Sequence, residues 1–104
     1  MAKAYIHAGI CGFTTDVTAV QNDEGKVEIS IDSTCPHIMK VADSIKEVEP
    51  YNEIGFFGGS IPSILQAHYS CPHAACPVFS GVVKAVEVAA GLALPKDVII
   101  TVSK

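Results

Sequence analysis

The chain has 104 residues, of which 49% are hydrophobic and 17% charged, and this length suits one domain over residues 1–104 with a single modest core. Its net charge is −4, with seven lysines and no arginine, so we expect no nucleic-acid partner, because phosphate recognition usually relies on a basic patch and arginine forks. No apolar run reaches the length of a membrane span, and the N-terminus lacks the apolar core of a signal peptide. We therefore expect a cytoplasmic protein without a membrane partner, whose apolar content favours self-association as a homodimer.

Residues 3–32 have the pattern of three β-strands. Residues 3–10 alternate between apolar and more polar side chains, residues 14–21 are rich in β-branched types, and residues 26–32 alternate again. The segment 22–25, Asn-Asp-Glu-Gly, is a turn signal between the second and third strands. These features predict a three-stranded antiparallel meander.

A helix is expected directly after the meander. Pro36 suits the first helical position, which puts Cys35 at or next to the N-cap. An apolar stripe with helical spacing continues to Val48, and Pro50 then ends the helix. Residues 51–61 contain three glycines and are expected to be irregular.

The rest of the chain predicts two further helices and a strand. A short helix is expected over about 60–68, and the longest helix begins at Pro77, which places Cys76 at its N-cap. Gly91 is a suitable residue to end that helix, and the apolar segment 98–102 reads as a last strand. The expected fold is α+β, in the order β-β-β-α-α-α-β, with the helices packed on one face of the sheet.

The four cysteines are expected to meet at one end of this fold. Cys11 follows the first strand and Cys35 follows the third, and in a meander these two strand ends lie at the same edge. If the long helix runs antiparallel to a rising last strand, Cys71 and Cys76 reach that edge as well. The predicted metal ligands are therefore Cys11, Cys35, Cys71 and Cys76.

The chemistry of these residues suits a metal site. Cys35 and Cys76 stand at helix N-termini, where free backbone N–H groups and the helix dipole stabilise a thiolate. His37 and His73 each lie two residues after a cysteine and are candidate alternative ligands. Four thiolates suit zinc or an iron–sulfur cluster, and a mixed set of thiolate and imidazole also suits zinc.

No local motif builds such a site by itself. The sequence contains no Cys-x2-Cys pair and no bacterial ferredoxin run, so the site exists only if the fold assembles it. The other two histidines, His7 and His68, are expected to be ordinary strand-face and helix-surface residues rather than ligands.

The cysteine pattern resembles that of the iron–sulfur cluster assembly scaffold family (IscU/NifU N-terminal type). That family has a cysteine in a Cys-Gly turn between its first two strands, here Cys11-Gly12, and a second one opening the helix after the third strand, here Cys35. A His-Cys pair opens its late long helix, here aligned with the segment Cys71 to Cys76, and residues 20–28 resemble its second turn. The similarity covers roughly residues 10–90 and implies a scaffold- or carrier-like protein that holds a cluster or metal ion.

The chain departs from this family at two functional positions. Phe13 stands where the family has an aspartate that promotes cluster release, and the adjacent His-Cys pair is replaced by the spaced segment Cys71 to Cys76. These differences favour holding a metal over handing it on. The chain also resembles a small uncharacterised family of proteins from anaerobic prokaryotes, from which no function would follow.

Three hypotheses follow from the sequence. The first is a non-enzymatic metal- or iron–sulfur-binding protein. The second is a thiol-based redox or sulfur-transfer protein with Cys35 or Cys76 as nucleophile. The third is an interaction module that binds no metal and dimerises through its apolar surface. No hydrolase or phosphate-binding motif supports classical enzyme chemistry.

Overall fold

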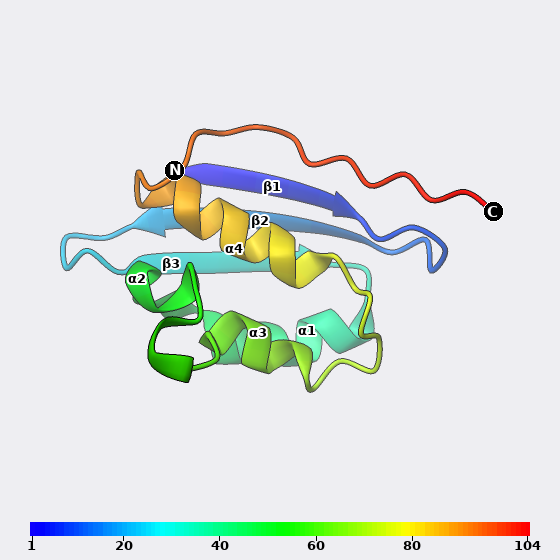
Figure 1. Ribbon diagram of the computed structural model, residues 1–104, viewed down its shortest axis with the longest axis horizontal. Coiled ribbons are helices and arrows are strands. Elements are labelled where there is room, and N and C mark those ends of the chain that lie inside the picture. Colours follow the sequence, from blue (N-terminus) through cyan, green and yellow to red (C-terminus); the bar gives the residue numbers. More distant parts are fainter.

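The computed structural model describes residues 1–104, and its centre is an antiparallel sheet with the strand order β1-β2-β3-β4. The strands are β1 (Ala2–His7), β2 (Thr14–Gln21), β3 (Val27–Ser33) and β4 (Glu47–Val48). The first three form the predicted meander (Figure 1). Asn22 fixes the turn between β2 and β3, because its side-chain oxygen accepts hydrogen bonds from the backbone N–H groups of Glu24 and Lys26.

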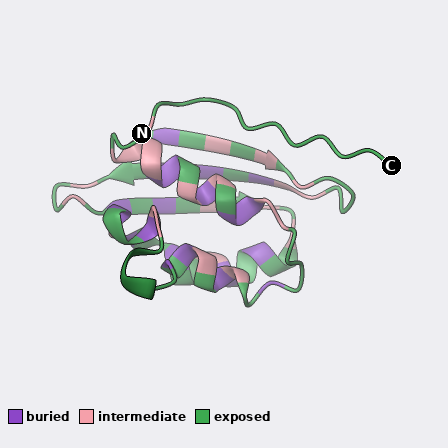
Figure 2. Ribbon diagram, in the orientation of Figure 1, coloured by how far each residue is buried: buried purple, intermediate pink, exposed green.

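The helical part covers one face of this sheet. It consists of α1 (Pro36–Ala42), the 3₁₀ turn η1 (Asp43–Ile45), α2 (Pro50–Glu53), the 3₁₀ turn η2 (Phe57–Gly59), α3 (Ser63–His68) and α4 (Val78–Ala89). α4 packs on β1 and β2, α1 packs beside β3, and α3 lies next to α4 (Figure 1). The strands alternate buried and exposed residues, so the opposite face of the sheet is open to solvent (Figure 2). The α+β class is confirmed.

The first helix is shorter than predicted. α1 ends at Ala42, and the apolar stripe continues through η1 into β4, where Val48 pairs with Val27 of β3. The backbone N–H of Ile29 donates to the carbonyl of Lys46 at 2.7 Å, which extends this ladder. Pairing with β3 satisfies backbone groups and still buries Val48, so it replaces the helix. Pro50, expected to end a helix, instead opens α2.

The long helix begins and ends close to the predicted positions. Its N-cap is Pro77 rather than Cys76, so the helix starts one residue later than expected. Its end is a Schellman motif: Leu92 N–H donates to the Glu87 carbonyl at 2.8 Å, and Gly91, with φ +74°, donates to Val88. Glycine suits this position because side chains disfavour a positive φ.

The predicted last strand is wrong as a strand of this sheet. The segment 98–102 is extended and runs beside β1 in Figure 1, but no backbone–backbone hydrogen bond involves residues 93–104. The fourth strand of the sheet is instead the two-residue β4. None of the helices has both the length and the apolar character needed to traverse a bilayer.

Candidate metal centre

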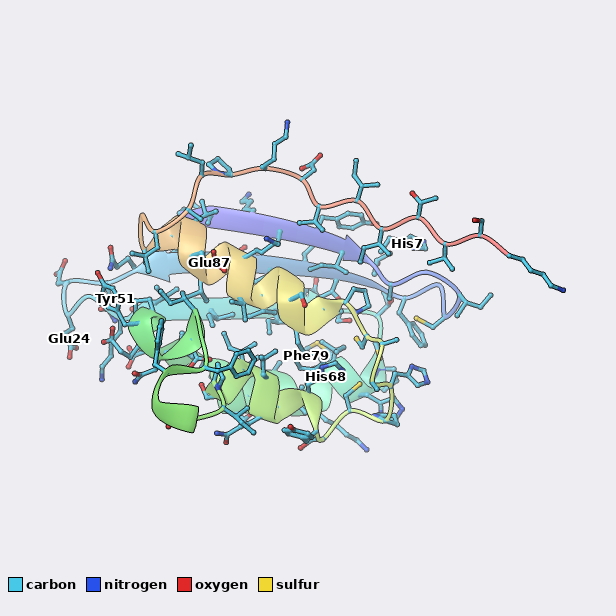
Figure 3. The ribbon with its side chains drawn as sticks, viewed as in Figure 1. His7, Glu24, Tyr51, His68, Phe79 and Glu87 are labelled. Atoms are coloured by element: carbon cyan, nitrogen blue, oxygen red, sulfur yellow. The ribbon has the colours of Figure 1, made fainter.

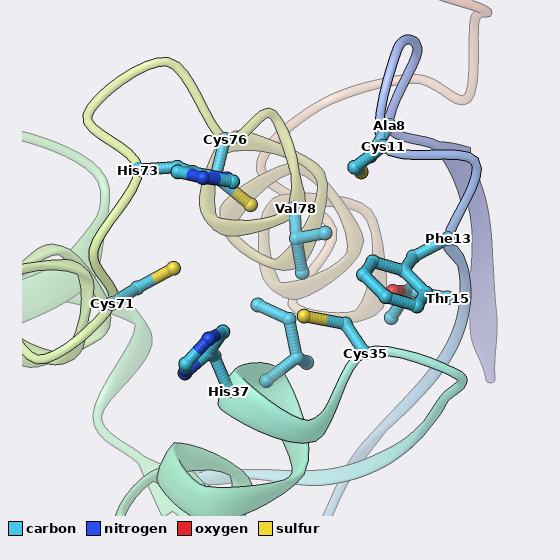
Figure 4. A pocket seen from close by; sticks show the side chains of 11 residues that line it. Ala8, Cys11, Phe13, Thr15, Cys35, His37, Cys71, His73, Cys76 and Val78 are labelled. Atoms are coloured by element: carbon cyan, nitrogen blue, oxygen red, sulfur yellow. The ribbon is translucent and has the colours of Figure 1, made fainter.

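One cavity at the end of the sheet collects the predicted site residues. It has a volume of about 120 Å³ and lies where the β1–β2 turn, the start of α1 and the start of α4 meet (Figure 4). Its lining includes every residue that the sequence singled out as a ligand: Cys11, Cys35, Cys71, Cys76, His37 and His73. The remaining wall is mostly apolar and includes Phe13, Ile38 and Val78. The topology thus brings together three chain segments that carry sulfur or imidazole groups.

The thiols of Cys35, Cys71 and Cys76, called the thiol cluster below, form the inner part of this arrangement. Figure 4 shows their sulfur atoms turned toward a common space, with the His37 imidazole beside them. All four cysteines are free thiols; Cys71 is buried, and Cys35 and Cys76 are half-buried. His37 and His73 are exposed at the rim.

Cys35 is positioned by the start of β2. As predicted, it is the N-cap of α1, and its backbone N–H donates to the hydroxyl oxygen of Ser33 at 3.1 Å. The hydroxyls of Ser33 and Thr15 share a hydrogen bond of 2.8 Å, and Thr15 is only 1% exposed. The main chain at Cys35 is therefore fixed to a rigid part of the sheet.

Cys71 lies in a turn held by His68. The backbone N–H of Cys71 donates to the carbonyl of His68 at 3.0 Å, and the His68 side chain bonds to the carbonyl of His73 at 2.7 Å. The His68 ring also stacks on Phe79 of α4, with ring centroids 4.4 Å apart. His68 is half-buried at the end of α3, so its ring contacts a second helix in addition to lying at the helix surface.

Cys76 has a raised pKa, which contradicts the expected thiolate stabilisation at this position. Burial of the thiol has the largest effect, and the charges of Cys71 and Cys35 and a hydrogen bond with the Cys71 side chain also raise the pKa. The backbone N–H of Val78 acts in the opposite direction but is outweighed. The same three thiols face one cavity in Figure 4.

Cys11 is set apart from the thiol cluster. It is exposed and lies in the turn between β1 and β2, which is closed by hydrogen bonds from Ala8 N–H to the Phe13 carbonyl and from Gly12 N–H to the Gly9 carbonyl. His7, the last residue of β1, contacts the same turn, since its Nδ1 accepts the Gly9 N–H at 3.2 Å. Cys11 lines the outer part of the cavity (Figure 4).

As the side chains stand, no group of three or more His, Cys, Asp or Glu residues is arranged to hold a metal ion. The sulfur donors share one cavity, but they do not already surround a single point. Coordination of an ion therefore requires adjustment of side chains or of the irregular segment 69–77.

Comparison with known proteins identifies a family but no function. Residues 2–102 match the model of a family of unknown function, DUF6951. No curated protein and no solved structure matches the chain. The similarity to the scaffold family thus continues to depend on the short cysteine motifs alone.

Proposed function

We propose, for a chain that belongs to the DUF6951 family of unknown function, that the thiol cluster binds a thiophilic metal ion or an iron–sulfur cluster. The observation that carries this proposal is that three thiols from two segments far apart in the sequence border one small cavity. Cys35 follows β3, Cys71 follows α3, and Cys76 precedes α4.

The donor types support a metal with a preference for sulfur. Thiolate and imidazole are the ligands that zinc prefers in proteins, and four thiolates are the common ligand set of iron–sulfur clusters. A bound cation would relieve the mutual repulsion that three neighbouring thiolates otherwise experience. Binding would also release the thiol protons, which makes metal affinity dependent on pH.

The position of Cys11 distinguishes a zinc site from an iron–sulfur cluster site, because only the cluster would need this cysteine. The thiol cluster with His37 provides a set of three sulfur atoms and one nitrogen, which is suitable for zinc without Cys11. A cluster with four thiolate ligands would need Cys11, the outer cysteine on the β1–β2 turn. His73 is the alternative imidazole at the rim, next to Cys76 in Figure 4.

The proposed role is that of a small cytoplasmic, non-enzymatic carrier or scaffold. Phe13 lines the cavity at the position where the scaffold family has its release-promoting aspartate. The apolar phenyl ring of Phe13 would exclude water from the thiolates and favour retention of the metal. A reducing compartment would keep the four thiols free for binding.

Anaerobic purification followed by metal, iron and acid-labile sulfide analysis tests the proposal. We expect stoichiometric zinc or an iron–sulfur cluster in the unaltered protein. Replacing Cys35, Cys71 or Cys76 by serine should lower zinc affinity roughly 100-fold, because each removes one of four ligands. Cys11→Ser is the matched control: it should retain zinc but lose an iron–sulfur cluster. A protein that binds neither, or in which Cys35→Ser and Cys11→Ser bind zinc equally well, contradicts the proposal.

A second candidate is supported by the position of Cys71 and Cys76. Both are free thiols in the segment 69–77 and both border the same cavity, so oxidation could join them in a disulfide. Oxidised glutathione would serve as the oxidant: the Cys71–Cys76 S–S bond would form, the S–S bond of glutathione would break, and the two glutathione thiols released would carry the two protons. Mass spectrometry after such treatment, with Cys71→Ser as control, separates reversible disulfide chemistry from metal binding.

A further inference from the structure

The C-terminal segment Val98–Val102 has the composition of a strand but pairs with none. Its sequence, Val-Ile-Ile-Thr-Val, consists only of β-branched residues, which favour extended structure. Ile99 is 85% exposed and Val102 is 88% exposed, and the whole tail is exposed in Figure 2. An uncharged, apolar, extended segment of this kind is a typical template for pairing with another strand.

The same chain carries a free strand edge. β1 is the first strand of the order and pairs only with β2. The hydrogen bond from Ala8 N–H to the Phe13 carbonyl continues the β1–β2 register, so the even-numbered residues of β1 direct their backbone groups toward β2. The alternation leaves the N–H and C=O groups of Lys3, Tyr5 and His7 pointing to the open edge.

This edge has few of the features that normally prevent strand addition. β1 contains no proline and its ladder with β2 has no bulge; its single charged residue is Lys3. On the helix-covered face, Ala4 and Ile6 are only partly buried, so a strand added beside β1 would have apolar side chains to pack against. The six residues of β1 also match the length of the five-residue tail segment.

We infer that two copies of this chain exchange C-terminal tails, and that Val98–Val102 of each copy adds as a strand to the outer edge of β1 of the other. The occupant is a second copy because each chain carries both the unpaired strand and the edge that accepts it. The tail runs beside β1 of its own chain in Figure 1 but makes no backbone hydrogen bond there. The family match extends through residue 102, so the tail is part of the shared module.

Exchange of this kind produces a closed dimer. Both tails and both β1 edges are used in one symmetric interface, and the contact does not propagate. The opposite edge of the sheet consists of the two-residue β4 and the remainder of β3, which α1 contacts, and it provides little surface for further addition. None of the cysteines of the cavity takes part, so this inference is independent of the proposed metal site.

Analytical ultracentrifugation of the full chain in reductant tests the exchange. We expect a dimer whose dissociation constant rises at least about tenfold with Ile100→Pro, which removes a backbone donor from the tail. Tyr5→Pro should act similarly, because the Tyr5 N–H faces the open edge and the β1–β2 ladder stays intact. Ser103→Pro, just beyond the paired segment, is the matched control and should leave dimerisation unchanged. Circular dichroism checks that each variant remains folded.

Mixing the two variants gives a sharper test. A chain with Ile100→Pro retains an intact β1 edge, and a chain with Tyr5→Pro retains an intact tail, so their mixture can form one of the two contacts. We expect the mixture to form heterodimers more tightly than either variant forms homodimers. A monomer at all concentrations, a dimer insensitive to Ile100→Pro, or a mixture no tighter than its components would overturn the inference.

Discussion

His68 stacks on Phe79 with an angle of 14° between the ring planes, and the same imidazole bonds to the carbonyl of His73 (Figure 3). Since His68 ends α3 and Phe79 lies in the first turn of α4, this one side chain joins two helices and the segment that carries Cys71. Phe79 is 1% exposed, so the anchor is part of the core. His68 is therefore a positioning residue for the thiol cluster.

Replacing His68 by alanine should weaken metal binding without removing a ligand. Residues that orient ligands typically change metal affinity 10- to 100-fold, and we expect His68→Ala to lower zinc affinity about tenfold in competition with a chelator. His68→Phe retains the stacking but loses the hydrogen bond, and should give an intermediate loss. Tyr69→Ala, at a neighbouring residue that is 78% exposed, is the control. Equal zinc affinities in all four proteins would show that the segment is positioned without His68.

The raised pKa of Cys76 predicts a specific dependence of stability on pH. The folded state favours the protonated thiol of Cys76. The thiol therefore contributes fully to the free energy of unfolding below its ordinary pKa of 9.0, and this contribution is lost as pH rises through the folded-state pKa. In reduced, metal-free protein, the free energy of unfolding should therefore fall between about pH 8 and pH 10. Cys76→Ala lacks this thiol but retains all the other titrating groups, so its free energy of unfolding should fall less over the same pH range. Parallel denaturant titrations of both proteins measure the difference, and identical slopes would exclude the effect.

The sequence predicted the gathering of the thiols because the meander has a simple geometry. Cys11 and Cys35 directly follow alternate strands, and the register between Thr15 and Ser33 brings those strand ends to one edge. The apolar periodicity of α4 likewise located the helix that brings Cys76 to the cavity, but α4 packs on β1 and β2 and not on the last strand from which its position was predicted. These features depend on residues that are near each other in the sequence, and local patterns describe them well.

The parts that the sequence did not predict depend on distant partners. The stripe that includes Val48 is compatible with a helix, and only the free edge of β3 converts its end into β4. The stacking of His68 has no sequence signal, because Phe79 already reads as an ordinary core residue. The segment Val98–Val102 is extended as expected, but a strand needs a hydrogen-bonded neighbour, and the segment pairs with no strand of its own chain.

Gly81 allows α4 to approach β1 closely. A Cβ at this position would lie 2.7 Å from both Cγ1 and Cδ1 of Ile6, nearer than side-chain atoms can pack. We expect Gly81→Ala to reduce the free energy of unfolding by about 1–2 kcal/mol, because the clash exceeds the gain in helix propensity. Ser80→Ala, on the exposed side of the same turn, is the control. In the double variant with Ile6→Ala, the cost of Gly81→Ala should disappear; a cost that persists would locate the strain elsewhere.

Glu53 supplies the N-terminal cap that α3 lacks in its own sequence. The N-cap of α3 is Pro62, which has no side-chain acceptor. The Glu53 carboxylate, ten residues earlier, accepts hydrogen bonds from the Ser63 N–H at 3.2 Å, the Ser63 hydroxyl at 2.7 Å and the Ile64 N–H at 2.8 Å. Glu53 is only 4% exposed, so its loss would leave buried donors without partners.

Glu53→Ala should therefore reduce the free energy of unfolding by about 2–4 kcal/mol, measured by denaturant titration. Glu53→Gln keeps one acceptor oxygen and should lose less. Glu24→Ala, in the exposed β2–β3 turn, removes the same charge without a cap and should change stability by less than about 0.5 kcal/mol. Because α3 ends at His68, the destabilised helix should also loosen the segment of Cys71 and lower zinc affinity in Glu53→Ala. Stability equal to that of Glu24→Ala would mean that the carboxylate does not cap α3 in solution.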